Sequence, residues 1–239
     1  MEQAHKEEIR INKYLSDAGI CSRREADRLV EAGRVSVDGK TVPMGAKVKE
    51  GQQIYIDGKL IKAEEEEILL AFYKPRGIVC TTSKKDKDNI VDFINYGKRI
   101  YPIGRLDKDS EGLILLTNKG EWVDAILRGS NYHEKEYIVH VNRPITDEFI
   151  KKMSSGMYLE EIDRDTRPCK VTKLDDRTFK IILTQGFNRQ IRRMCETVGY
   201  KVTRLKRIRV MNIELGKLKV GTYREVSEEE KRVLLSHLE

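Results

Sequence analysis

Residues 101–121 read YPIGRLDKDSEGLILLTNKGE, and they place three acids in a polar turn just before the apolar run LILL: Asp107, Asp109 and Glu111. Taken alone, such a segment is most often a solvated β-turn. The spacing also matches the first six positions of a calcium-binding EF-hand loop. However, Leu115 and Asn118 stand at the ninth and twelfth positions, and the twelfth requires a bidentate Glu. The turn is therefore at best a weak calcium site.

The sequence around this turn predicts an α+β domain. From Ile68 onward, the apolar runs ILLAFYKP, EYIVHV, CKVTKL and TFKIIL mingle with helical segments, without a regular βαβ rhythm. This order favours a central antiparallel or mixed sheet flanked by helices. The stretch GLILLTNKGE lacks the spacing of a dinucleotide fingerprint or a phosphate-binding P-loop. The sequence therefore shows no recognisable loop for binding the nucleotide cofactors of redox or phosphoryl-transfer enzymes.

A smaller module precedes this domain, with two short helices followed by a small sheet. Ser22, with Glu25 three positions later, forms a capping box at the start of the second helix. The dipeptide Asp38-Gly39 lies between alternating apolar and polar residues and predicts a β-hairpin. The predicted divisions are residues 9–62 for the module, 63–67 for an acidic linker and 68–239 for the larger domain.

Two predicted helices carry cations at their N-terminal ends. Arg23 and Arg24 follow the cap of the module's second helix. In NRQIRRMCETVG, Asn188 is the predicted cap, and three arginines crowd the opening turn: Arg189, Arg192 and Arg193. The helix dipole disfavours positive charge there unless an anion binds. A solvated face is the plainer interpretation of such arginines. RNA phosphates fit both sites, and a carboxylate would serve equally well at the second.

The composition is compatible with an RNA-binding protein but does not require one. Lys and Arg total 46 against 39 Asp and Glu, which gives a formal net charge of +7, and such a surface attracts polyanions. The four cysteines and four histidines show no metal-ligand spacing, so we expect neither disulfides nor a metal. Since no signal peptide or membrane-spanning run is visible, we expect a cytoplasmic monomer without a membrane partner.

Together these segments resemble a known family. GRLDKDSEGLILLTN resembles the signature of the ribosomal RNA pseudouridine synthases of the RsuA/RluB/RluE/RluF family, and its sequence is most similar to the RluF branch. INKYLSDAGICSRREADRLVEAGRVSVDGKTV resembles an S4 (αL-type) RNA-binding domain, KEYIVHV the family's tyrosine motif and NRQIRRMCETVGYKVTRLKRIRV its third motif. Gln185 replaces the glutamate often found before the glycine of that motif, which points to the RluF branch. The resemblance covers nearly the whole chain.

The resemblance also implies roles for individual residues. Asp107 is the expected nucleophile and Tyr137 the ring that stacks on the base. Arg192 is the expected cation that pairs with the aspartate, and Arg189 stays open as an alternative.

Other residues are expected to contact the substrate. Leu205 is the expected apolar contact beneath the base, and Ile208 competes for this role. Further substrate contacts are expected from Arg105, Asn188, Gln190, Arg189 and Arg193. Contacts between the S4 module and RNA are expected from Lys13, Arg23, Arg24 and Arg28.

The implied reaction is the isomerisation of a specific uridine in 23S ribosomal RNA to pseudouridine, and transfer RNA stays open as a further substrate. The N-glycosidic bond breaks, and the uracil turns and rejoins the same ribose through carbon. No atom or electron is gained, so the reaction needs no cofactor. An ionised carboxylate can attack either the ribose or the base ring. The base must first be flipped out of the RNA stack and held by an aromatic ring.

Two other functions are compatible with parts of the sequence. A non-catalytic S4-type ribosome-assembly factor would explain the basic helices, but it would leave Asp107 without a use. A glycoside hydrolase could use the acids of residues 107–111 as general acid and nucleophile. The single tryptophan offers little aromatic surface for sugar binding, so this alternative is the weaker one.

Overall fold

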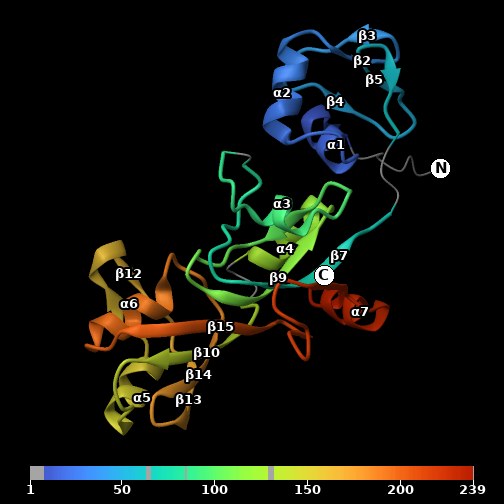
Figure 1. Ribbon diagram of the computed structural model, residues 1–239. Coiled ribbons are helices and arrows are strands. Elements are labelled where there is room, and N and C mark those ends of the chain that lie inside the picture. Colours follow the sequence, from blue (N-terminus) through green and yellow to red (C-terminus); the bar gives the residue numbers. More distant parts are fainter. Residues whose placement is uncertain (1–7, 63–65, 84, 129–131, 239) are drawn as a thin grey trace, which may run out of the picture. The chain divides into compact units, whose positions relative to one another are not determined.

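The computed structural model describes four stretches of the 239-residue chain: residues 8–62, 66–83, 85–128 and 132–238 (Figure 1). By their contacts, the residues form two compact units that divide between residues 67 and 68, and residues 97–99 belong to the first unit. Residues 63–65 of the predicted acidic linker lie outside the described part.

In its described part, the first unit consists of two short helices and two small sheets. The helices are α1 (Ile11–Asp17) and α2 (Arg23–Glu31). One antiparallel sheet has the strand order β3 (Lys40–Thr41), β2 (Val35–Val37), β5 (Ile54–Ile56) and β6 (Lys59–Leu60). The other sheet pairs β1 (Ile9–Arg10) with β4 (Lys47–Val48). Apolar residues from both helices and from β1, β2, β4 and β5 share one core.

The cap of α2 and the hairpin form as predicted, but of the predicted capping box only the bond to Ser22 is present in the described structure, because the Glu25 carboxylate pairs with Arg28. The Ser22 hydroxyl accepts a hydrogen bond from the backbone N–H of Glu25 at 3.2 Å and so caps α2. The Glu25 carboxylate receives a hydrogen bond from Arg28 at 3.0 Å. Asp38 and Gly39 have φ angles of 50° and 80°, the left-handed pair that a tight hairpin between β2 and β3 requires.

A mixed sheet forms the centre of the second unit, as the sequence predicts. Within the described residues its main strand order is β13 (Lys170–Asp175), β14 (Thr178–Leu183), β10 (Lys135–Val141), β15 (Val202–Val210), β9 (Glu111–Thr117), β7 (Leu69–Lys74) and β17 (Tyr223–Glu225). β8 (Tyr101–Ile103) pairs with β9, and β16 (Ile213–Glu214) pairs with β15. β9 and β15 are parallel, and the other pairs are antiparallel.

The central strands β7 and β9 are buried along their whole length. Leu113 and Leu115 of β9 pack into one apolar cluster with Trp122, whereas Ile114 and Leu116 pack into another. Successive side chains of a strand point to opposite faces, so both faces of this part of the sheet are covered. This explains why LILL is a continuous apolar run and not an alternating one. A third cluster surrounds β10, β14 and the helices beside them.

The helices of the second unit are α3 (Ile90–Ile94), α4 (Gly120–Leu127), α5 (Asp147–Ser154), α6 (Gln190–Thr197) and α7 (Glu228–Ser236). A small hairpin of β11 (Tyr158–Leu159) and β12 (Arg164–Asp165) encloses a 3-10 turn, η2 (Glu160–Ile162). In the described part of the chain, no helix is both long and apolar enough to cross a membrane.

One predicted helix boundary is wrong. Asn188 does not cap α6; the cap is Arg189, whose backbone is left-handed with φ 54° and ψ 28°. Instead, the carbonyl of Asn188 accepts a hydrogen bond from Arg193 Nε at 3.1 Å. The helix therefore begins at Gln190, directly after Arg189.

Candidate active site

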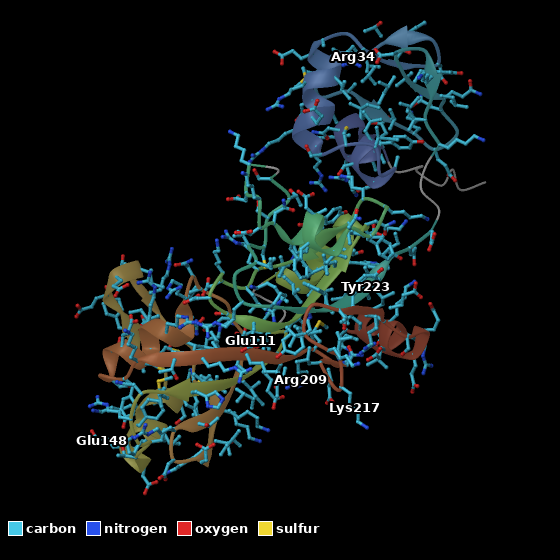
Figure 2. The ribbon with its side chains drawn as sticks, viewed as in Figure 1. Arg34, Glu111, Glu148, Arg209, Lys217 and Tyr223 are labelled. Atoms are coloured by element: carbon cyan, nitrogen blue, oxygen red, sulfur yellow. The ribbon has the colours of Figure 1, made fainter. Side chains whose placement is uncertain are left out.

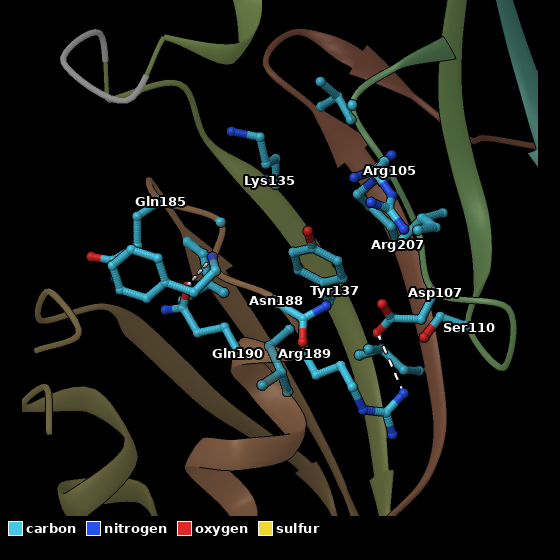
Figure 3. Close-up of a pocket in the computed structure, with 18 of the residues that line it drawn as sticks. Arg105, Asp107, Ser110, Lys135, Tyr137, Gln185, Asn188, Arg189, Gln190 and Arg207 are labelled. Carbon is cyan, nitrogen blue, oxygen red and sulfur yellow. Dashed lines mark hydrogen bonds and ion pairs between the residues drawn. The ribbon is translucent and has the colours of Figure 1, made fainter. Parts of the chain in front are cut away.

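A cavity of about 470 Å³ opens beside the Asp107 turn (Figure 3). Its walls come from the segment between β8 and β9, from β10, from residues 185–191 and from β15. Seven of the expected site residues line it: Arg105, Asp107, Tyr137, Asn188, Arg189, Gln190 and Leu205. The fold thus brings together side chains that lie up to 100 positions apart in the sequence.

Backbone hydrogen bonds fix the Asp107 turn. The N–H of Ser110 donates to the carbonyl of Asp107 at 3.0 Å and closes the turn. Before it, the N–H of buried Leu106 donates to Cys80 Sγ at 3.3 Å. Burial raises the pKa of the Cys80 thiol, so it stays neutral. The carboxylate of Asp107 is therefore presented by a backbone that is anchored on both sides.

Gly112 permits the close approach of the turn to β15. It pairs with Arg207 where β9 and β15 run parallel, and its φ is 112°. A Cβ atom at this position would lie 2.6 Å from the backbone nitrogen of Arg207 and would collide with its carbonyl oxygen. Only glycine lets the two strands meet here, next to the Asp107 turn.

Two arginines contact Asp107 and Asp109, and both of them contact Asp109. Arg189 Nη1 lies 3.9 Å from Asp107 Oδ2, the contact dashed in Figure 3, and 3.3 Å from Asp109 Oδ1. Arg192 Nη2 lies 3.2 Å from Asp109 Oδ2 and 3.2 Å from Ser110 Oγ. The guanidinium within ion-pair distance of Asp107 is therefore that of Arg189, the alternative left open by the sequence. The expected Arg192–Asp107 pair is not the one observed, because Arg192 lies one turn deeper in α6 and reaches Asp109 instead.

Arg192 is buried, and burial is the main cause that lowers its pKa. The charge of Asp109 acts in the opposite direction and favours the protonated guanidinium. The Nη1 of Arg192 also donates a hydrogen bond to the carbonyl of Val202 at 3.4 Å. Arg192 therefore ties α6, the Asp107 turn and the start of β15 together from beneath the surface.

Tyr137 and Leu205 form the apolar part of the cavity wall. Tyr137 is half-buried in β10 and contacts two of the apolar clusters. Leu205 is only 6% exposed and belongs to the cluster around β10 and β14. Ile208, its competitor, packs instead against the cluster that contains Leu113. Leu205 is therefore the one of the two at the cavity.

Comparison with known proteins identifies the family. A model of the RNA pseudouridylate synthase family matches residues 68–197, more than half of the chain, and a model of the S4 domain matches residues 9–54. The chain belongs to the RNA pseudouridylate synthase family. It is an isomerase with an N-terminal S4 RNA-binding domain, as its sequence signature implies.

Individual relatives support the same assignment. The dual-specificity RNA pseudouridine synthase RluF of Escherichia coli K12 is 51% identical over 224 residues, which cover 93% of this chain and 77% of that protein. The ribosomal large subunit pseudouridine synthase B of Bacillus subtilis is 36% identical over 92% of this chain and 93% of its own length. A crystal structure of a pseudouridylate synthase superposes with a TM-score of 0.70 at 28% identity and covers 95% of this chain and 99% of that one.

Some expected contact residues of this synthase lie away from the cavity. Arg193 forms an ion pair with Glu161 and is not among the lining residues. The four expected RNA contacts of the S4 unit lie in or beside its two helices. Of these, Lys13 is half-buried and three are exposed: Arg23, Arg24 and Arg28.

The sequence interpretation missed several residues that line the synthase's cavity: Lys135, Gln185, Phe187 and Arg207. Lys135 lies two positions before Tyr137 on β10, so the period of a strand places both on one face and could have identified it. Lys135 Nζ donates to the carbonyl of His133 at 3.1 Å. Burial, with a smaller contribution from the charge of Arg207, lowers the pKa of Lys135 to about 8.

Glu111, the third acid of the turn, belongs to the interior of the synthase (Figure 2). Arg204 Nε lies 2.5 Å from its Oε1, and the Tyr73 hydroxyl donates to its Oε2 at 3.0 Å. The hydrogen bond from Arg204 is the main cause that lowers the pKa of Glu111. A carboxylate held ionised in this way is a poor general acid, which weakens the glycoside hydrolase alternative. Among the described residues, no three His, Cys, Asp or Glu side chains gather around a possible metal position.

Proposed function

We propose that this synthase isomerises a specific uridine of 23S ribosomal RNA, with Asp107 as the nucleophile. The observation that carries the proposal is the position of the Asp107 carboxylate. It is 29% exposed, lines the same cavity as Tyr137 and Leu205, and lies 3.9 Å from the guanidinium of Arg189. A flipped base can stack on the tyrosine while the carboxylate attacks the nucleotide.

Each neighbour has a separate part in the proposed reaction. Arg189 stabilises the ionised Asp107 carboxylate in a partly desolvated site. It pairs with this carboxylate again when the covalent intermediate breaks down. Arg192 is a positioning residue, since its contacts with Asp109 and Ser110 hold the turn. Leu205 supports the base from the apolar side. Isomerisation leaves the atom and electron count of the RNA unchanged, so these side chains suffice for the proposed steps.

The names of the relatives support the choice of RNA. One relative is a ribosomal large subunit synthase and another has dual specificity. We therefore propose large-subunit ribosomal RNA as the main substrate and transfer RNA as a second one. The S4 unit would bind the backbone of the structured RNA through Arg23, Arg24 and Arg28. We further propose that the protein acts as a cytoplasmic monomer.

The substitution Asp107→Asn tests the nucleophile. It removes the charge and keeps the shape, so we expect isomerisation of 23S ribosomal RNA to be lost. The Kd for this RNA should change by less than about threefold, which corresponds to about 0.6 kcal/mol, no more than one weak hydrogen bond. Isomerisation is measured by pseudouridine mapping of RNA treated with the purified protein. Retained turnover in the variant would reject Asp107. An inactive wild type that binds the RNA would favour a non-catalytic assembly factor.

A further inference from the structure

A second cleft adjoins the catalytic cavity. It has a volume of about 690 Å³ and shares Arg105, Asp107 and Arg189 with the first cavity. It then continues onto the turn after β7, with Arg76 and Gly77, and onto Lys108. The Gly77 N–H donates to the carbonyl of Lys108 at 2.7 Å. This bond fixes the turn that carries Arg76 relative to the turn that carries Asp107.

The second cleft has an excess of positive charge. Four cations line it, Arg76, Arg105, Lys108 and Arg189, against two acids, Asp107 and Asp109. Both carboxylate oxygens of Asp109 are occupied, by Arg189 and by Arg192. The cations are close enough for their charges to oppose one another: Arg189 and Arg76 both act to lower the pKa of Arg192. A cluster of like charges is stabilised when an anion binds to it.

Two of these cations have unused hydrogen-bond donors. Lys108 is already paired with Asp88 at 3.3 Å. By contrast, Arg76 and Arg105 are exposed, and within the described stretches of the chain neither guanidinium has a hydrogen bond or an ion pair. A planar guanidinium without a partner offers a phosphate two parallel N–H donors.

We infer that this second cleft binds the phosphodiester backbone of the substrate strand next to the reacting nucleotide, with Arg76 as its main cation. The inference rests on the proposed function. If the base of the target uridine lies in the first cavity and its ribose meets Asp107, the phosphates attached to that ribose must pass along the far wall of the Asp107 turn. The second cleft is lined by that same turn. Contacts of this kind fix the register of the strand without reading its sequence.

Binding of RNA by the Asp107→Asn variant tests the subsite without turnover. The probe is a fluorescein-labelled 23S ribosomal RNA transcript, and Kd is measured over a range of salt concentrations. Adding Arg76→Ala is expected to weaken binding roughly tenfold, as the loss of one charge-assisted contact implies, and to reduce the salt slope by about one. Arg76→Lys retains the charge and is expected to recover most of the slope.

The matched control is Arg232→Ala on α7, an exposed arginine of the same unit. The control should leave Kd within about twofold. If Arg76→Ala and Arg232→Ala change Kd and the salt slope equally, the subsite is rejected, because the effect then comes from net charge alone. Both substituted positions are exposed, so the two variants should have equal melting temperatures. If Arg76→Ala melts at a lower temperature, the comparison is made with Arg76→Lys instead.

A modified RNA identifies the phosphate. Once the isomerised uridine is mapped, a neutral methylphosphonate linkage is placed on either side of it. The neutral linkage should weaken binding by the Asp107→Asn parent but not by the variant that also lacks Arg76. Equal losses in both proteins would overturn the assignment. Should the wild type isomerise no uridine, the proposed function fails, whereas the salt slope of Arg76→Ala still decides the subsite.

Discussion

Arg189 caps α6 and Arg192 lies about one turn later in that helix. Both contact Asp109, but Arg189 also lies beside Asp107, and their burial differs. The Arg189 side chain is 42% exposed and lies at the cavity beside Asp107, whereas that of Arg192 is 9% exposed and lies on Asp109. If Asp107 is the nucleophile, as proposed, an exposed cation beside it acts on the rate, because its contact matters most in the charged states of the reaction. A buried cation that holds a turn acts on stability, since its removal leaves its partner oxygens without a donor.

Substitution of the two arginines by alanine should therefore separate rate from stability. We expect Arg189→Ala to lower kcat by about a hundredfold with little change in the urea midpoint. Arg192→Ala should destabilise the synthase unit by about 2–3 kcal/mol. Single-turnover kinetics and urea denaturation of both variants measure these effects. The opposite ranking, a stable but inactive Arg192→Ala beside a nearly active Arg189→Ala, would return the catalytic role to Arg192.

Lys135 makes the stability of the unit depend on pH. Its pKa is about 8 in the folded protein and has the ordinary value of 10.5 in the unfolded chain. Between these values the unfolded chain holds more protons, so the wild type gains stability as pH rises through this window. Below about pH 8 the buried charge is destabilising. Lys135→Met should therefore be more stable than the wild type at pH 7 by about 1–3 kcal/mol.

The difference between Lys135→Met and the wild type should shrink towards zero as pH approaches 10.5. Urea denaturation of both proteins at pH 7, 8.5 and 10 measures it, and their other titrating groups cancel in the comparison. A difference that stays constant across this range would contradict the lowered pKa.

At the scale of elements, the parallel pair of β9 and β15 determines where the Asp107 turn lies. Lys206 and Arg207 pair with Glu111 and Gly112, and Gly112 is the point of closest approach.

Gly112→Ala would force the strands apart, so we expect the free energy of unfolding to fall by about 3–5 kcal/mol and isomerisation to be lost. Gly216→Ala is the control. Its φ is also positive, at 54°, but its Cβ would meet nothing within 4 Å, so only the backbone strain of about 1 kcal/mol applies. Equal losses in the two variants would show that the strand contact does not matter.

Local elements could be predicted from sequence because their signals are local. Ser22 caps α2 and Asp38-Gly39 forms the hairpin, since both depend on a few neighbouring residues. The cap of α6 could not be predicted, because it uses Arg189 in a left-handed conformation that non-glycine residues rarely adopt. The helix boundary then shifts, and this decides which arginine faces Asp107. The pairing of β9 with β15, about 95 residues apart in the chain, is also tertiary and has no local signal.

At the scale of the whole molecule, the resemblance named seven of the residues that line the cavity, because the family motifs carry residues from four separate segments. Two of the lining residues that it did not name, Lys135 and Arg207, lie on the same strands as Tyr137 and Leu205. Lys135 could have been found from the period of its strand, whereas the position of Arg207 follows from strand pairing, which becomes visible only once the sheet order is known.

The S4 unit should supply a large share of RNA affinity through α2. Arg23 and Arg24 occupy the first turn of this helix, are exposed and add to the positive end of its dipole. The double substitution Arg23→Glu with Arg24→Glu should weaken binding of 23S ribosomal RNA and reduce the salt slope by about two, one for each lost phosphate contact.

The control Lys40→Glu with Lys59→Glu changes the net charge equally on exposed positions of β3 and β6. It should leave the slope nearly unchanged if the contacts are specific to α2. An unchanged slope in the arginine variant, with normal melting, would mean that α2 does not contact RNA and that the cations around the catalytic cavity bind the backbone instead.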